Sequence, residues 1–87
     1  MTPDQLKEAE QWAALPYTAD QLATILGIKP AVLRIALDDP EDPLGNAIMR
    51  GRLIAKGDLY KKIITLSNQG SGPAQAMLRE LFEKAEL

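Results

Sequence analysis

Two stretches of this 87-residue chain carry most of its positive charge, and their cations are the side chains best suited to bind a polyanion. Lys29 and Arg34 form the first stretch, and the second, from Arg50 to Lys62, holds five cations against one acid, Asp58. The formal net charge of the whole chain is nevertheless −2. A local basic surface on an acidic protein predicts polyanion binding of modest affinity that weakens as salt is added.

The chain contains few side chains that could act in catalysis or bind a metal ion. The chain has no histidine and no cysteine, which removes the usual general base, the thiolate nucleophile and the commonest transition-metal ligands. The acidic stretch from Asp38 to Asp42 lacks the glycine and the distant glutamate of a calcium loop, so we interpret it as a solvated connector. We therefore expect a protein that is not an enzyme and that uses no cofactor and no metal.

The elements that must position the cations are helices. Thr2 and Thr18 are expected N-caps, each with a glutamine three residues later, and Gly27 is an expected left-handed C-terminal stop. Apolar residues at helical spacing, interrupted by prolines, predict an all-α fold of five helices without strands. Apolar positions expected to face inward are Leu6, Ala9, Trp12, Leu15, Leu22, Ala23, Ile25, Leu26, Val32, Leu33, Ala36, Leu37, Ala74, Met77, Leu78, Leu81 and Phe82.

A helix-turn-helix pattern lies between Tyr17 and Leu37. Such a motif needs a small residue where its helices cross, a glycine four residues later, and two apolar residues that close the core. Ala23, Gly27, Ile28 and Leu33 meet these needs in order. They are packing residues, however, so they predict an angle between helices and not a ligand.

The residues of this motif that would face a DNA major groove are Lys29, Pro30, Ala31, Arg34 and Ile35. Only Lys29 and Arg34 can reach a phosphate or a guanine edge, which favours loose or shape-dependent binding over tight recognition of one site. The expectation requires both cationic tips to point outward and to be free of acidic partners.

The stretch from Leu44 to Asn68 contains no proline and is expected to be one long helix. Its apolar residues cover about half of the helix circumference or more, which is wider than the stripe that one small core requires. We therefore expect a single domain, residues 1–87, made of a helix-turn-helix unit (2–38) and a helical hairpin (44–86). The excess apolar surface predicts a homo-oligomer.

The order of these motifs resembles the small terminase subunits of tailed phages and prophages, which take part in DNA packaging. The resemblance covers about residues 18–82: the helix-turn-helix, an Asp-Pro linker, then LGNAIMRGRLIAKGDLY from Leu44 and SNQGSGPAQAML from Ser67. It implies a ring-forming protein that binds double-stranded DNA and regulates a large ATPase–nuclease subunit. The DNA contacts would fall on Lys29, Ala31 and Arg34, with support from Arg50 and Arg52.

Two functions from different classes remain open on this sequence. One is DNA binding in phage DNA packaging, and the alternative is a helical adaptor for protein–protein interaction or oligomerisation that binds no nucleic acid. No apolar run has the length of a membrane span, and the N-terminal residues lack the basic region of a signal peptide. We expect a soluble, cytoplasmic protein without a membrane partner.

Overall fold

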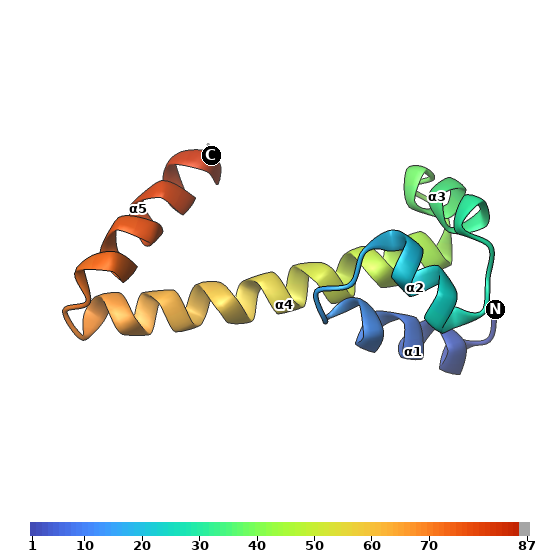
Figure 1. Ribbon diagram of the computed structural model, residues 1–87, viewed down its shortest axis with the longest axis horizontal. Helices are drawn as coiled ribbons and strands as arrows, with labels where there is room; N and C mark the ends of the chain where they lie inside the picture. The colour runs from blue at the N-terminus through green and yellow to red at the C-terminus, as the bar shows by residue number, and fades with distance from the viewer. Residues whose placement is uncertain (86–87) are drawn as a thin grey trace. The chain divides into compact units, whose positions relative to one another are not determined.

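Five α-helices make up the protein in the computed structural model, which describes residues 1–85 (Figure 1). They are α1 (Pro3–Ala13), α2 (Ala19–Leu26), α3 (Pro30–Asp38), α4 (Pro43–Asn68) and α5 (Gly72–Ala85). No strand occurs among the described residues, and the all-α prediction is confirmed. Within the same residues, no helix has both the length and the hydropathy needed to cross a membrane. Residue 86, where the predicted hairpin ends, lies outside the described residues.

Local interactions set the helix ends, as the sequence predicts. Thr2 and Thr18 each accept a hydrogen bond at 3.2 Å from the backbone N–H three residues later, and the glutamine side chain there accepts one in return. These are two complete capping boxes. Gly27 ends α2 with φ of 72°, a left-handed conformation that glycine adopts without steric cost.

The acidic linker also has a structural role that the sequence analysis did not assign. One carboxylate oxygen of Asp42, Oδ1, accepts hydrogen bonds from the backbone N–H groups of Leu44 and Gly45, at 2.9 and 3.1 Å. Asp42 is half-buried and thereby caps the start of α4. The interpretation of the whole stretch as a solvated connector is therefore too simple at this residue.

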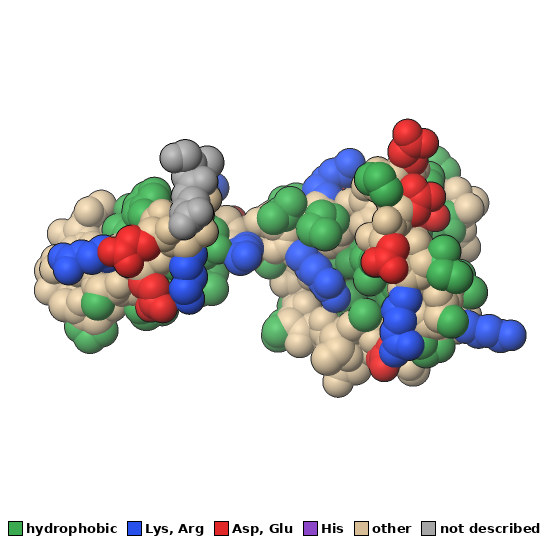
Figure 2. Space-filling model, turned by 90° about the horizontal axis from the view of Figure 1, so that it is seen from above, with side chains coloured by type: hydrophobic (Ala, Val, Ile, Leu, Met, Phe, Trp, Pro, Cys, Tyr) green, Lys and Arg blue, Asp and Glu red, His purple; other side chains and the backbone are tan. Residues whose placement is uncertain are grey.

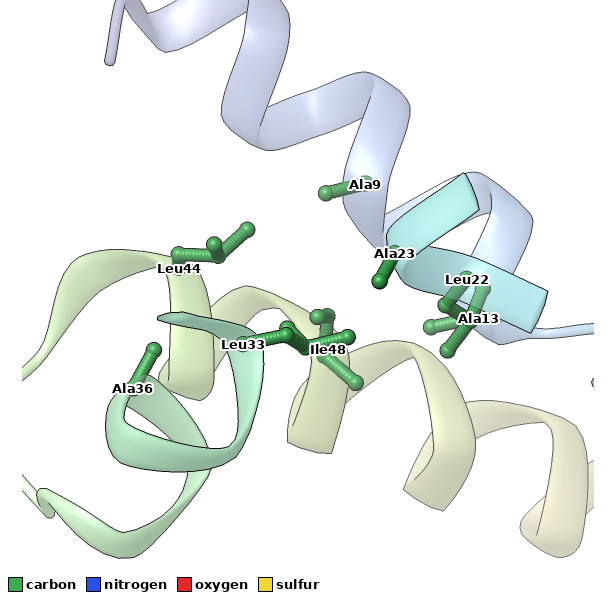
Figure 3. Close-up of a cluster of buried hydrophobic side chains, with 8 residues drawn as sticks. All are labelled: Ala9, Ala13, Leu22, Ala23, Leu33, Ala36, Leu44 and Ile48. Carbon is green, nitrogen blue, oxygen red and sulfur yellow. The ribbon is translucent and has the colours of Figure 1, made fainter. Parts of the chain in front are cut away.

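The chain divides into two compact units, residues 1–55 and the residues from Lys56 onward. The boundary falls inside α4 and not in the acidic linker, where the sequence analysis separated the helix-turn-helix from the hairpin. In the first unit, α1, α2, α3 and the first turns of α4 share one core, so this part of α4 packs with the helix-turn-helix (Figure 3). The core side chains are Ala9, Ala13, Leu22, Ala23, Leu33, Ala36, Leu44 and Ile48.

Two glycines of α4 allow its neighbours in the first unit to approach closely. A methyl group on Gly45 would overlap the backbone carbonyl of Ala36 in α3, and one on Gly51 would overlap the carbonyl of Glu10 in α1. Alanine and glycine at these crossings keep the core small. The contacts explain why glycine occupies helical positions that otherwise favour alanine.

In the second unit, the turn before α5 is defined by hydrogen bonds. Gly70 has φ of 90°, and the Ser71 hydroxyl accepts a hydrogen bond at 3.3 Å from the backbone N–H of Ala74, which is buried. The Gln75 side chain donates to the carbonyl oxygen of Ser67 at 3.2 Å. Among the described residues of this unit, up to residue 85, the buried apolar side chains are Ile63 and Ala74.

Several apolar residues expected to face inward are exposed instead, and for them the prediction is wrong. Leu15, Ile25, Val32, Met77 and Phe82 range from 38% to 67% exposed. Helical spacing identifies an apolar stripe, whereas burial depends on how much of that stripe a neighbouring helix covers. In the first unit, closely crossing helices with alanine at their contacts cover only the middle of the stripe, so Leu15, Ile25 and Val32 stay exposed to water.

Candidate nucleic-acid interface

The turn between α2 and α3 has the backbone hydrogen bonds of a Schellman motif. The N–H of Ile28 donates to the carbonyl of Ala23 at 3.0 Å, and Gly27 N–H donates to the carbonyl of Thr24 at 3.2 Å. Ala23 and Leu33 are fully buried and Ile28 is half-buried, as the helix-turn-helix pattern predicts. These contacts bring α3 against α2 with one face in the core and the other in solvent.

The solvent face of α3 is mainly apolar. Ala31, Val32, Arg34 and Ile35 are exposed, whereas Leu33 and Ala36 are buried. Lys29 is the exposed N-cap residue, and it makes no side-chain capping hydrogen bond. Of the predicted DNA-binding residues, Lys29, Ala31 and Arg34 therefore share one exposed stretch at the start of this helix.

Arg34 is exposed but is not free of acidic partners, so that part of the expectation is wrong. Its Nη2 donates to Oδ1 of Asp20, in the first turn of α2, at 2.6 Å. The two side chains are 62% and 59% exposed, and exposed ion pairs contribute about 0.2–1 kcal/mol. A phosphate or a base edge can therefore displace Asp20 at small cost. In the described part of the chain, Lys29 takes part in no ion pair.

Among residues 1–85, no ion pair joins Arg50 or Arg52 to this stretch. The Nε of Arg50 lies 3.9 Å from Oε1 of Glu10 in α1, and Arg52 is half-buried. In the part of Figure 2 that shows the first unit, on the right, lysine and arginine side chains do not form one continuous area, because acidic and apolar side chains lie between them. The five predicted residues are thus one short stretch on α3 and two separate positions on α4.

An open apolar groove borders the exposed face of α3 within the first unit. Its volume is about 450 Å³, and its lining includes Met1, Ile28, Val32, Ile35 and Leu44. Asp42 is the titratable side chain in this lining, and its carboxylate already caps α4. The groove therefore offers an apolar surface for binding rather than an arrangement of acids and bases.

Two aromatic residues of the first unit, Trp12 and Tyr17, lie next to each other. Trp12 is half-buried and packs against the core, which agrees with its predicted structural role. Its ring centroid lies 6.3 Å from that of Tyr17, at an interplanar angle of 56°. Helical spacing does not predict this pair, because Tyr17 lies in the loop after α1, where the helical repeat does not extend. With a tilted partner beside it, Trp12 presents no open platform for base stacking.

Two residues of the first unit, Asp20 and Gly51, form contacts that the sequence pattern did not indicate. Asp20 lies 14 residues before Arg34, so no helical repeat relates them, and only the α2–α3 crossing brings them together. Gly51 lies on α4, but its role is the contact with α1. The described residues also contain no cluster of acidic side chains that could hold a metal ion.

Comparisons with protein-family models, curated proteins and solved structures find no match for this chain. Functional inference therefore depends on the residues of the chain and on their arrangement.

Proposed function

We propose that the protein binds double-stranded DNA through the helix-turn-helix formed by α2 and α3. We further propose that it serves in the cytoplasm as a non-enzymatic component of phage or prophage DNA packaging, similar to small terminase subunits. The observation that carries the DNA-binding proposal is the α2–α3 unit: a left-handed Gly27, a fully buried crossing, and an outward α3 with Lys29, Ala31 and Arg34 at its start. In helix-turn-helix proteins, the first residues of the second helix contact base edges.

Each cation has a distinct role in this proposal. Lys29 pairs with a backbone phosphate, and the positive end of the α3 dipole supports the same contact. Arg34 exchanges Asp20 for a phosphate or a guanine edge, a step favoured by the exposure of the existing pair. Arg50 and Arg52 add phosphate contacts only if the DNA extends to α4.

Asp20 limits the affinity that this interface can reach. Its carboxylate stays close to the DNA backbone after Arg34 has left it, and like charges near a phosphate oppose binding. With two to four phosphate contacts, the logarithm of the binding constant should fall with the logarithm of salt with a slope of about −2 to −4. The expected binding is modest and salt-sensitive.

The apolar surface of α4 supports the proposal that the protein forms homo-oligomers. Six large apolar side chains of this helix are 38–57% exposed: Met49, Leu53, Ile54, Leu59, Ile64 and Leu66. Exposed apolar surface of this extent is typical of protein–protein contacts. Assembly through α4 would place several copies of α3 on one DNA molecule and raise the overall affinity without new contacts. A large ATPase–nuclease subunit is the proposed further partner.

The experiment that tests DNA binding is fluorescence anisotropy with a random-sequence duplex, titrated at several salt concentrations between about 50 and 200 mM. The wild-type protein should bind at the low end and release the DNA at the high end. Arg34→Glu should weaken binding by about tenfold or more, since it removes a cation and adds an anion next to Asp20. Arg79→Glu, an exposed arginine of α5 outside the candidate interface, is the matched charge-reversal control.

The second candidate function is a helical adaptor that binds other proteins and no nucleic acid. The apolar solvent face of α3 and the ion pair of Arg34 favour it, because both are also typical of a protein-binding surface. If anisotropy shows no duplex binding at low salt with micromolar protein, the DNA proposal is wrong and the adaptor takes its place. Light scattering coupled to size exclusion tests assembly separately.

A further inference from the structure

The most exposed large apolar side chain among the described residues is on α3. Ile35 is 71% exposed, and Val32, one turn earlier at the edge of the groove, is 51% exposed. Ala31, Arg34 and Ile35 have the i, i+3 and i+4 spacing that places residues on one helix face. The outward face of this helix therefore combines one cation with an isoleucine that the core does not use.

This composition does not suit base recognition by hydrogen bonds. Asparagine and glutamine, the side chains that read adenine, are absent from α3, and Arg34 is its only cation. The major groove presents one apolar group to a protein, the 5-methyl group of thymine, and small or apolar side chains recognise it. The chemistry of Ile35, with Ala31 beside it, matches that group.

The charges around Ile35 are of both signs, so DNA is taken as the molecule that contacts Ile35 because of the proposed function and not because of charge. Lys29 precedes the face and Arg34 lies next to Ile35, but Arg34 is paired with Asp20, and Asp42 lines the same groove as Ile35. The acid of this helix, Asp38, lies in its last turn. Asp38 follows Ile35 by three residues, so it lies on the same helix face, one turn closer to the C-terminal end of α3, where it opposes close approach of the DNA backbone.

We infer that α3 recognises thymine methyl groups through Ile35, supported by Ala31, and that the protein therefore prefers duplexes rich in A·T pairs. This inference rests on the proposed DNA binding and names the feature of the DNA that is recognised. Arg34 supplies the phosphate or guanine contact next to it. The preference is moderate, since it arises from apolar contact and not from paired hydrogen bonds.

The test compares two duplexes of the same A·T-rich sequence, one with thymine and one with uracil in its place. Uracil lacks only the 5-methyl group and keeps the same hydrogen-bonding groups at the base edge. Anisotropy titrations at low salt should show tighter binding to the thymine duplex, by about fourfold for each methyl group buried, which corresponds to roughly 0.8 kcal/mol per carbon.

Two variants assign the effect to a side chain. Ile35→Ala should bind both duplexes with the weaker affinity, so that the ratio between them falls to about one. Ile25→Ala is the control, because it removes the same side chain from an exposed position of α2 and should leave the ratio unchanged. Ile35 is largely exposed, so its truncation should preserve the helical circular dichroism spectrum.

The outcomes separate this inference from the proposed function. Equal affinity of the wild-type protein for both duplexes would overturn thymine recognition while leaving DNA binding in place. A thymine preference that persists in Ile35→Ala would also overturn it, since another side chain would then be responsible. If neither duplex binds, DNA binding itself is refuted, and the face of α3 is assigned to a protein partner.

Discussion

Replacing Gly51 by alanine tests the close crossing of α1 and α4, on which the arrangement of the first unit depends. A methyl group at this position would overlap the carbonyl oxygen of Glu10 and would lie 3.1 Å from the Cβ of Ala13. A backbone carbonyl cannot rotate away as a long side chain can, so α1 must shift. The shift would disturb Ala9 and Ala13, which are both buried in the core.

Gly57 provides a matched control on the same helix, because a methyl group there would meet nothing within 4 Å. Glycine inside a helix costs about 0.5–1 kcal/mol relative to alanine, so Gly57→Ala should raise the free energy of unfolding by that amount. Gly51→Ala gains the same helix propensity but also overpacks the crossing, which typically costs about 1–3 kcal/mol. We expect a net loss of about 1–2 kcal/mol for Gly51→Ala.

Thermal and urea unfolding followed by far-ultraviolet circular dichroism measure both variants. For a chain of this size, a change of 1 kcal/mol in the free energy of unfolding shifts Tm by about 4–8 °C. Gly57→Ala should therefore raise Tm measurably, and Gly51→Ala should lower it. Since the two glycines lie in different units, the urea dependence should be checked for a single transition. If Gly51→Ala is as stable as Gly57→Ala, α1 and α4 do not cross as closely as described.

Three further predictions concern the interface, the turn and the assembly. Asp20→Asn should change the free energy of unfolding by less than about 1 kcal/mol, because the ion pair is exposed. The same variant should tighten duplex binding severalfold in anisotropy, since it removes the acid that competes with DNA for Arg34. Unchanged affinity would mean that the ion pair does not weaken DNA binding. Gly27→Ala should lower the free energy of unfolding by about 1 kcal/mol in urea titrations, because alanine is strained at φ of 72°, and a neutral result would argue against this turn. Size exclusion with light scattering should give the wild-type protein a mass above the 9.5 kDa of one chain, and Leu53→Asp should lower it; a wild-type monomer at high concentration would refute assembly through α4.

Helix ends were predictable because they depend on residues close together in the chain. The capping boxes at Thr2 and Thr18 are made of hydrogen bonds between residues three positions apart. The left-handed conformation of Gly27 depends on a local property, the absence of a side chain at that residue. The predicted turn of the helix-turn-helix, with Ala23 and Leu33 buried, also follows from spacing within a short segment. The positions of Lys29 and Arg34 near the start of α3 could be predicted from the order of the residues alone.

The acidic partners of Arg34 and Arg50 could be identified only from the tertiary structure. Asp20 reaches Arg34 across 14 positions, and Glu10 reaches Arg50 from another helix, so both pairs depend on the angles at which helices cross. Periodicity gave no sign that α4 would be shared between two units, because its apolar pattern continues through the boundary.

The sequence by itself therefore determined the all-α class, the number of helices and the places where they stop, since backbone hydrogen bonding and side-chain capping act over three to five residues. Only the tertiary structure decided that Gly45 and Gly51 are contact points, that Val32 is exposed to water, and that Arg34 forms an ion pair. These features depend on which part of each apolar stripe a neighbouring helix covers. That coverage is set by how closely two backbones approach, a property of pairs of distant segments and not of either one alone.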